Sequence, residues 1–242
     1  MRLFNSFISK DSPKKENINT TFCPYCNHKL DKFPTRKSAC SFCKNIFFVR
    51  TNPITNKKVI LTEKELERNE KEWRSYYNAS EFERKLNSTF DIGKYPFNQL
   101  KDKIKLDLLK KFGREPSLGD SLWGLSNALI IEAIEKRDYD FLSHIYWCQS
   151  YFLYIENKNY IPTMELFFEI KLKQYQSSGF ESVEIITCGE QSCTSCQKLE
   201  GKVINITDAL ATKPLPCKDC TFDLESVNEI GWCRCAYGPH IS

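Results

Sequence analysis

Residues 23–43 read CPYCNHKLDKFPTRKSACSFC, in which thirteen residues separate two CxxC pairs, Cys23/Cys26 and Cys40/Cys43. Two residues between the cysteines of a pair let both sulfurs of a tight turn face one ion. Two such turns then complete a closed tetrahedron of four thiolates. The spacing predicts a structural zinc ion that folds a segment too small to build its own core.

Two apolar runs follow the second pair, IFFVRT from residue 46 and KKVIL from residue 57, with the turn-forming NPITN between them. Such runs around a turn are typical of a β-hairpin. The hairpin would complete a zinc ribbon over residues 21–61. Residues 1–20 are expected to be a flexible lead-in.

Residues 62–180 have helical periodicity and predict an α-helical domain. Thr62 is expected to cap its first helix in a capping box with Glu65, because the sequence there reads TEKE. That helix should run to about residue 86, with Leu66, Trp73, Tyr77 and Phe82 on one stripe.

Further helices are predicted by apolar spacing, end signals and Pro162, which suits a first helical turn. They cover residues 99–112, about 120–137 with Asp120 as the cap, about 139–156, and about 162–176.

Residues 181–242 hold seven of the twelve cysteines and predict a small metal-stapled α+β module. Short strands are expected over 181–187 and 202–206. The cysteines form two CxxC pairs and a CxC pair, and one stands apart: Cys193/Cys196, Cys217/Cys220, Cys233/Cys235 and Cys188.

We favour a second zinc site built on the first CxxC pair, one cysteine of the next, and one or both cysteines of the CxC pair. Its candidate ligands are Cys193, Cys196, Cys220, Cys233 and Cys235. Whether Cys188, Cys217 or His240 joins this site is left open. Two zinc ions are therefore expected in all.

The fold class predicted by these segments is α+β, mainly α. The 242 residues contain no run of about 18 apolar residues, so no membrane span is expected. No secretory signal is recognisable, and the cytosol keeps thiols reduced, so metal binding explains the cysteines better than disulfides do. A cytoplasmic location is expected.

Basic residues concentrate in residues 1–50, where ten Lys and Arg stand against three Asp and Glu, a formal charge of +7. Six of them surround the first cysteine cluster: Lys29, Lys32, Arg36, Lys37, Lys44 and Arg50. They either contact the phosphates of a nucleic acid or simply offset the charge of the thiolates.

An enzyme is the alternative interpretation. The chain has only three histidines and no Walker, GxSxG or GxGxxG motif. A nuclease of the HNH type would need histidines within the C-terminal cluster. A zinc deaminase would need HxE before PCxxC; the chain has CGE ending at Glu190 before the PCKDC of residues 216–220.

The segments CPYCNHKLDKFPTRKSACSFC, PSLGDSLWGLSNALI and SCTSCQKLEGKVINITDALATKPLPCKDC resemble an uncharacterised group of bacterial and prophage-associated zinc-ribbon proteins. The last segment, with GWCRCAY, is also similar to the C-terminal Cys module of phage head-morphogenesis proteins. Both resemblances imply zinc binding and a link to phages or mobile elements.

Together, these features predict a non-enzymatic zinc-binding protein that acts as a nucleic-acid- or protein-binding module. No small-molecule substrate is identified. The alternative is a metal-dependent nucleic-acid enzyme, nuclease- or deaminase-like, that uses the C-terminal cysteines.

Overall fold

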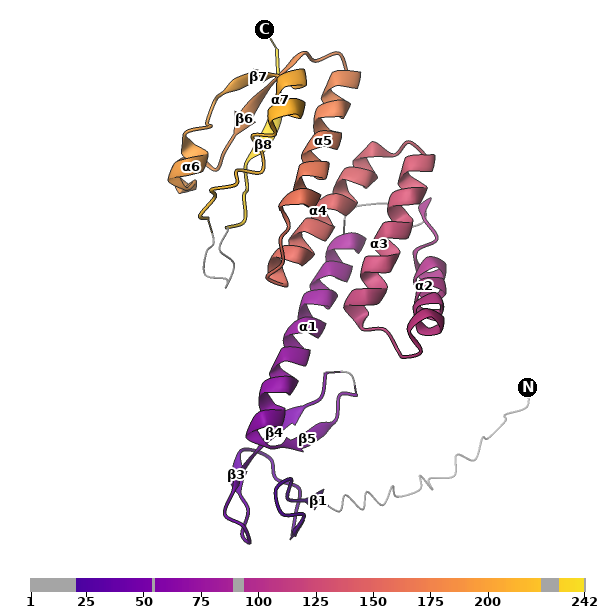
Figure 1. Ribbon diagram of the computed structural model, residues 1–242, viewed down its shortest axis with the longest axis vertical. Helices are drawn as coiled ribbons and strands as arrows, with labels where there is room; N and C mark the ends of the chain where they lie inside the picture. The colour runs from indigo at the N-terminus through magenta and orange to yellow at the C-terminus, as the bar shows by residue number, and fades with distance from the viewer. Residues whose placement is uncertain (1–20, 54, 89–93, 223–230, 242) are drawn as a thin grey trace, which may run out of the picture. The chain divides into compact units, whose positions relative to one another are not determined.

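The computed structural model describes residues 21–53, 55–88, 94–222 and 231–241 (Figure 1). The expected lead-in over residues 1–20 lies outside the described residues. The chain divides into two compact units, Met1–Trp73 and Arg74–Ser242. The protein is α+β and mainly helical, as the sequence predicts, with a cysteine group near each end of the chain. The domain boundaries expected after residues 61 and 180 stay predictions.

The first unit is built on short antiparallel strands. Strand β1 (Thr21–Phe22) pairs with β2 (Lys29–Leu30), and β3 (Ser38–Ala39), β4 (Ile46–Thr51) and β5 (Lys58–Leu61) form a sheet in that order. The predicted hairpin is therefore confirmed. The small core of the first unit contains Cys23, Cys40 and Phe47, each at most 2% exposed.

Helix α1 (Glu63–Asn87) begins at the predicted capping box. The N–H of Thr62 donates to Glu65 Oε2 over 2.9 Å, and the N–H of Glu65 donates to Thr62 Oγ1 over 3.3 Å. The single stripe expected along this helix is wrong, because Tyr77 is 63% exposed and Trp73 is 39% exposed. Phe82 packs in the core of the second unit, whereas the Trp73 indole donates to the Thr51 carbonyl of the first.

Four helices form the middle of the second unit. They are α2 (Phe97–Phe112), α3 (Leu118–Glu135), α4 (Tyr139–Ile155) and α5 (Ile161–Ser177). Helices consecutive in the chain pack side by side, and the shared core includes Phe82, Leu125 and Ile145 (Figure 1). All four were predicted by apolar spacing.

Local chemistry sets the helix ends. Gly113 adopts the left-handed conformation (φ 65°) that ends α2, and Pro162 lies in the first turn of α5. The expectation that Asp120 caps α3 is wrong by three residues. Ser117 is the cap, because its Oγ accepts from the Asp120 N–H over 3.1 Å while Asp120 Oδ2 accepts from the Ser117 hydroxyl over 2.8 Å.

The C-terminal part forms a three-stranded antiparallel sheet in the order β7-β6-β8, from Val203–Asn205, Ser182–Ile186 and Ala236–His240. The first two strands match the prediction. The short helices of this part are η2 (Gly189–Gln191), α6 (Thr194–Gln197) and α7 (Ile206–Thr212). Val183 and Ile185 of β6 share a core with Phe168 and Leu172 of α5, so the cysteine-rich segment packs directly on a helix. Within the described residues, no helix has both the length and the apolar character needed to cross a membrane.

Candidate metal centres

The four predicted N-terminal ligands converge on one point. The Sγ atoms of Cys23, Cys26, Cys40 and Cys43 all lie within 4.8 Å of one another. Cys23 Sγ lies 3.7 Å from Cys43 Sγ, and Cys26 Sγ lies 3.8 Å from Cys40 Sγ. None of the twelve cysteines of the chain forms a disulfide.

The two CxxC turns of this centre have the same backbone design. In the first, the Cys23 N–H donates to the His28 carbonyl over 2.8 Å and the Asn27 N–H donates to the Cys23 carbonyl over 2.9 Å. In the second, Cys40 and Lys44 make the corresponding bonds over 2.9 and 3.0 Å. Asn27 and Lys44, each directly after a pair, are left-handed with φ of 56° and 63°. Both turns therefore aim their two sulfurs at the same point.

Backbone hydrogen bonds prepare this centre for a cation. The N–H of Cys43 lowers the pKa of the Cys40 thiol to about 6. The N–H of His28 lowers that of Cys26, but burial and the neighbouring sulfurs outweigh it and raise its pKa to about 12. Crowded sulfurs share protons unevenly unless a metal ion replaces those protons.

The C-terminal cysteines form a second, larger group. Cys193, Cys196 and Cys220 make one triad and Cys196, Cys233 and Cys235 another, each with its sulfurs within 4.8 Å of one another. Cys220 Sγ lies 3.9 Å from Cys193 Sγ and 3.7 Å from Cys196 Sγ. All five cysteines that we favoured as ligands are thus brought together.

Three chain segments deliver these sulfurs. Cys193 is the N-cap residue of α6 and Cys196 lies within that helix. The Cys220 N–H donates to the Cys217 carbonyl over 3.2 Å, which closes the second CxxC turn. Cys233 lies in the segment leading into β8.

The three residues that the sequence left open differ in placement. Cys217 lies beside the group, because its N–H donates to Cys233 Sγ over 3.3 Å. Cys188 precedes η2 and His240 pairs with Ser182 across the sheet. None of the three belongs to a metal-compatible group among the described residues.

Burial and hydrogen bonding shift the thiols of this group in opposite directions. Burial raises the pKa of Cys193, but N–H groups of Thr221 and Cys196 outweigh it and lower the value to about 6. Burial raises the pKa of Cys196 and Cys217. The thiols of this group therefore share their protons unevenly, as those of the first centre do.

The sulfur separations agree with tetrahedral metal coordination. A zinc–sulfur bond of about 2.3 Å gives a tetrahedron with an edge of about 3.8 Å. The separations of 3.7 to 3.9 Å in both centres match that edge. Both groups can therefore hold metal ions. At such a centre, the thiolates would bind the ion and hold their chain segments together.

The six basic residues predicted around the first centre are all exposed: Lys29, Lys32, Arg36, Lys37, Lys44 and Arg50. Arg50 lies 3.7 Å from Glu70, and Lys37 lies over the Phe48 ring. Exposed aromatic rings accompany them. Phe42 is 69% exposed and stacks on the His28 imidazole, with ring centroids 4.8 Å apart and planes 9° apart.

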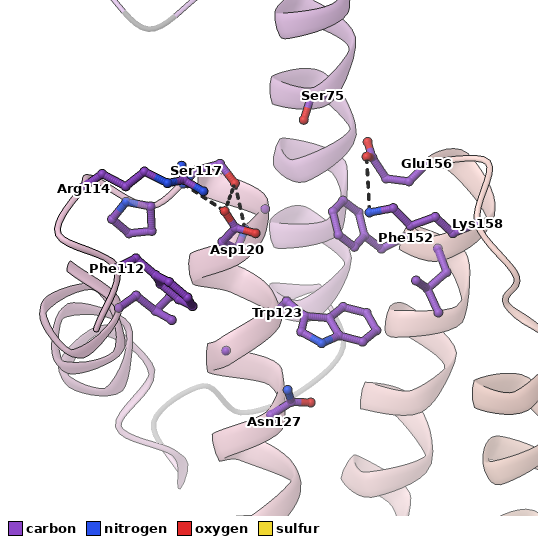
Figure 2. Close-up of a pocket in the computed structure, with 15 residues that line it drawn as sticks. Ser75, Phe112, Arg114, Ser117, Asp120, Trp123, Asn127, Phe152, Glu156 and Lys158 are labelled. Atoms are coloured by element: carbon purple, nitrogen blue, oxygen red, sulfur yellow. Dashed lines mark hydrogen bonds and ion pairs between the residues drawn. The ribbon is translucent and has the colours of Figure 1, made fainter. Parts of the chain in front are cut away.

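A cavity of about 590 Å³ lies in the second unit among residues of α2, α3 and α4 (Figure 2). Phe112, Trp123 and Phe152 line it. Its acidic side chains are engaged in the fold, since Asp120 belongs to the α3 capping box and Glu156 accepts from Asn78 over 2.8 Å. We therefore take the two cysteine groups, rather than this cavity, as the candidate functional sites.

No protein-family model, curated protein or solved structure matches the chain. Sequence reasoning missed two residues that support the second centre, Tyr160 and Gly231. The Tyr160 hydroxyl contacts the backbone on both sides of Trp232. A contact of this kind leaves no local sequence signal, because the two segments lie 71 residues apart.

Proposed function

We propose that the N-terminal ribbon is a zinc-stabilised module that binds single-stranded nucleic acid. The observation that carries the proposal is the exposed stack of Phe42 on His28 beside the metal-compatible cysteines. Phe42 lies inside the second CxxC turn, and His28 follows the first, so the stack joins the two turns. Every base has a π-face that can stack on such a ring.

Charge supports the same proposal. Residues 21–61 hold eight Lys and Arg and one acidic residue, Asp31, a formal charge of +7. Four thiolates with one zinc ion contribute −2, which leaves about +5 on a small surface. Such a surface attracts a phosphate backbone at low ionic strength.

Zinc is the proposed metal because four thiolates at tetrahedral separation are its preferred structural site. The ion would shape both turns and hold the aromatic stack outside the small core. A closed four-thiolate site leaves no coordination position for substrate, so the proposed role is binding rather than catalysis.

The test is fluorescence anisotropy of labelled single-stranded DNA and RNA with the full chain and its Phe42→Ala variant. Loss of one stacked base costs about 1–3 kcal/mol, so affinity should fall roughly 5- to 150-fold. Ile46→Ala is the matched control, since Ile46 is also exposed (49%) on the ribbon but has no π-face. Equal loss in both variants, or no binding at low salt, contradicts the proposal.

Lys44→Asn separates charge from folding. Lys44 has a left-handed backbone, which asparagine tolerates better than most residues, and Asn27 occupies the same position in the first turn. The variant should keep its metal, while the dependence of log affinity on log salt becomes shallower by about 0.7. An unchanged dependence of log affinity on log salt would show that Lys44 does not contact the nucleic acid.

A further inference from the structure

The cavity among the helices of the second unit has the size of a ligand-binding site. Its volume is about 590 Å³. Pockets for small organic molecules typically measure roughly 300–1,000 Å³. The lining residues come from α1, α2, α3 and α4 and from the loops that follow α2 and α4, and all of them belong to the second unit.

Three aromatic rings give this cavity an apolar surface. Phe152 is 7% exposed and stacks on the buried Phe82 ring with centroids 4.6 Å apart, and the Trp123 ring lies 6.3 Å from Phe152. The core therefore holds two of the rings in place. Phe112, at the end of α2, is 56% exposed. A bound molecule that covers the Phe112 ring removes apolar surface from water, which is favourable.

One charge at the cavity is unbalanced. Glu156 lies 4.0 Å from Lys158 Nζ, and Asp120 belongs to the capping box of α3. These engaged acids argue against catalysis at the cavity but not against binding. Among the described residues, the Arg114 guanidinium has no ion-pair or hydrogen-bond partner. Because a guanidinium stays charged and its planar fork matches a carboxylate, a carboxylate is the ligand group that complements it.

We propose that this cavity binds an elongated aromatic carboxylate, whose rings pack on Trp123 and Phe112 and whose carboxylate accepts from the Arg114 guanidinium. Figure 2 shows Arg114 and Phe112 on one side of α3 and Trp123 and Phe152 on the other. An elongated ligand that lies across α3 therefore reaches both the rings and the cation. The cavity shares no residue with the ribbon, so this site does not depend on the proposed nucleic-acid binding.

The test is an NMR titration of the full chain with para-biphenylcarboxylate and with its neutral analogue, para-biphenylcarboxamide. The indole N–H signal of Trp123, assigned by its loss in Trp123→Phe, should shift to saturation with the carboxylate. A ligand of this size is expected to have a Kd of about 0.5 mM or lower. The indole signals of Trp73, Trp147 and Trp232 should not move, because none of these residues lines the cavity. No saturable shift at Trp123, or equal affinity for the two probes, would overturn the proposal.

Charge and ring contacts are separated by variants. Arg114→Gln should weaken carboxylate binding roughly 10-fold and leave carboxamide binding unchanged. Lys110→Gln is the matched control, because it removes the same charge from an exposed residue of α2 that does not line the cavity. Phe112→Ala should weaken both probes by a similar factor, roughly 2- to 12-fold. Equal loss of carboxylate affinity in Arg114→Gln and Lys110→Gln would overturn the pairing with Arg114.

Discussion

The Tyr160 hydroxyl bridges the backbone on both sides of Trp232. It donates to the Gly231 carbonyl over 2.6 Å and accepts from the Cys233 N–H over 3.2 Å. Tyr160 is the N-cap residue of α5 and is 2% exposed. Burial raises its pKa, so the hydroxyl stays protonated and able to donate. The Tyr160 side chain thus fixes the backbone at Cys233, a candidate metal ligand.

Tyr160→Phe should destabilise the second unit and weaken metal binding at the C-terminal group. The substitution leaves a buried carbonyl and a buried N–H without their partner, at a cost of about 1–3 kcal/mol. Urea unfolding and competition with a zinc chelator measure the two effects. Tyr139→Phe is the control, because Tyr139 is 51% exposed and should change neither. Equal metal affinity in the wild type and Tyr160→Phe would show that the hydroxyl does not position Cys233.

Gly231→Ala should disrupt the loop that carries Cys233. A Cβ at residue 231 would lie 2.1 Å from the Phe222 carbonyl oxygen, and both are held there because the Gly231 N–H donates to the Cys220 carbonyl over 2.8 Å. The backbone must move, and the segments carrying Cys220 and Cys233 should separate. The expected result is loss of at least one C-terminal ion by native mass spectrometry.

Gly119→Ala in α3 is the matched control for that substitution. There the added methyl meets the Phe152 ring at 3.2 Å, a side chain that can shift slightly, and alanine favours the helix. Its metal count should equal that of the wild type. Full metal content in Gly231→Ala would contradict the close contact.

Local signals in the sequence were sufficient for much of this fold. The CxxC spacing, the Thr62–Glu65 capping box and Pro162 each act over a few residues. The capping box and Pro162 have the predicted roles, and the CxxC pairs Cys23/Cys26 and Cys40/Cys43 bring their four sulfurs together. The cap of α3 was misassigned because Ser117 and Asp120 are both cap-forming residues in one capping box.

Features that depend on distant residues were missed. Strand β8 contains Gly238 and Pro239, which do not suggest a strand, yet Pro239 pairs with Val183 at a sheet edge, where proline is tolerated. The expectation of a single apolar stripe on α1 was wrong because the residues of this helix are divided between the two units. Cys217 was left open because CxxC spacing alone does not say which sulfurs share an ion.

Cys40→Ser should unfold the first unit without unfolding the second. Cys40 is 1% exposed within a core that has few other members, so loss of the ion removes most of what holds the ribbon together. Trp73 emission should shift to longer wavelength as its bond to the Thr51 carbonyl is lost. Cys148→Ser is the control, because Cys148 is buried in the helical core and lies outside both metal-compatible groups. Unchanged ribbon folding in Cys40→Ser would refute the first centre.

His144 should make the second unit less stable as the pH falls. Burial lowers its pKa, and its Nε2 donates to the Lys85 carbonyl over 3.0 Å, with Cys148 Sγ 3.3 Å away. The folded state therefore holds this imidazole neutral, while the unfolded chain protonates it near its ordinary pKa of about 6.5. Below that pH the unfolded state binds more protons, so stability falls by up to about 1.4 kcal/mol per pH unit until the folded pKa is reached.

His144→Gln removes this titration but keeps an N–H that can donate to Lys85. The free energy of unfolding, measured in urea between pH 7.5 and 5.5, should fall less steeply in the variant than in the wild type. Metal release at acid pH also lowers stability, so native mass spectra must show equal ion counts in the two proteins at every pH compared. Parallel curves at equal metal content would mean that His144 titrates alike in the folded and unfolded chain.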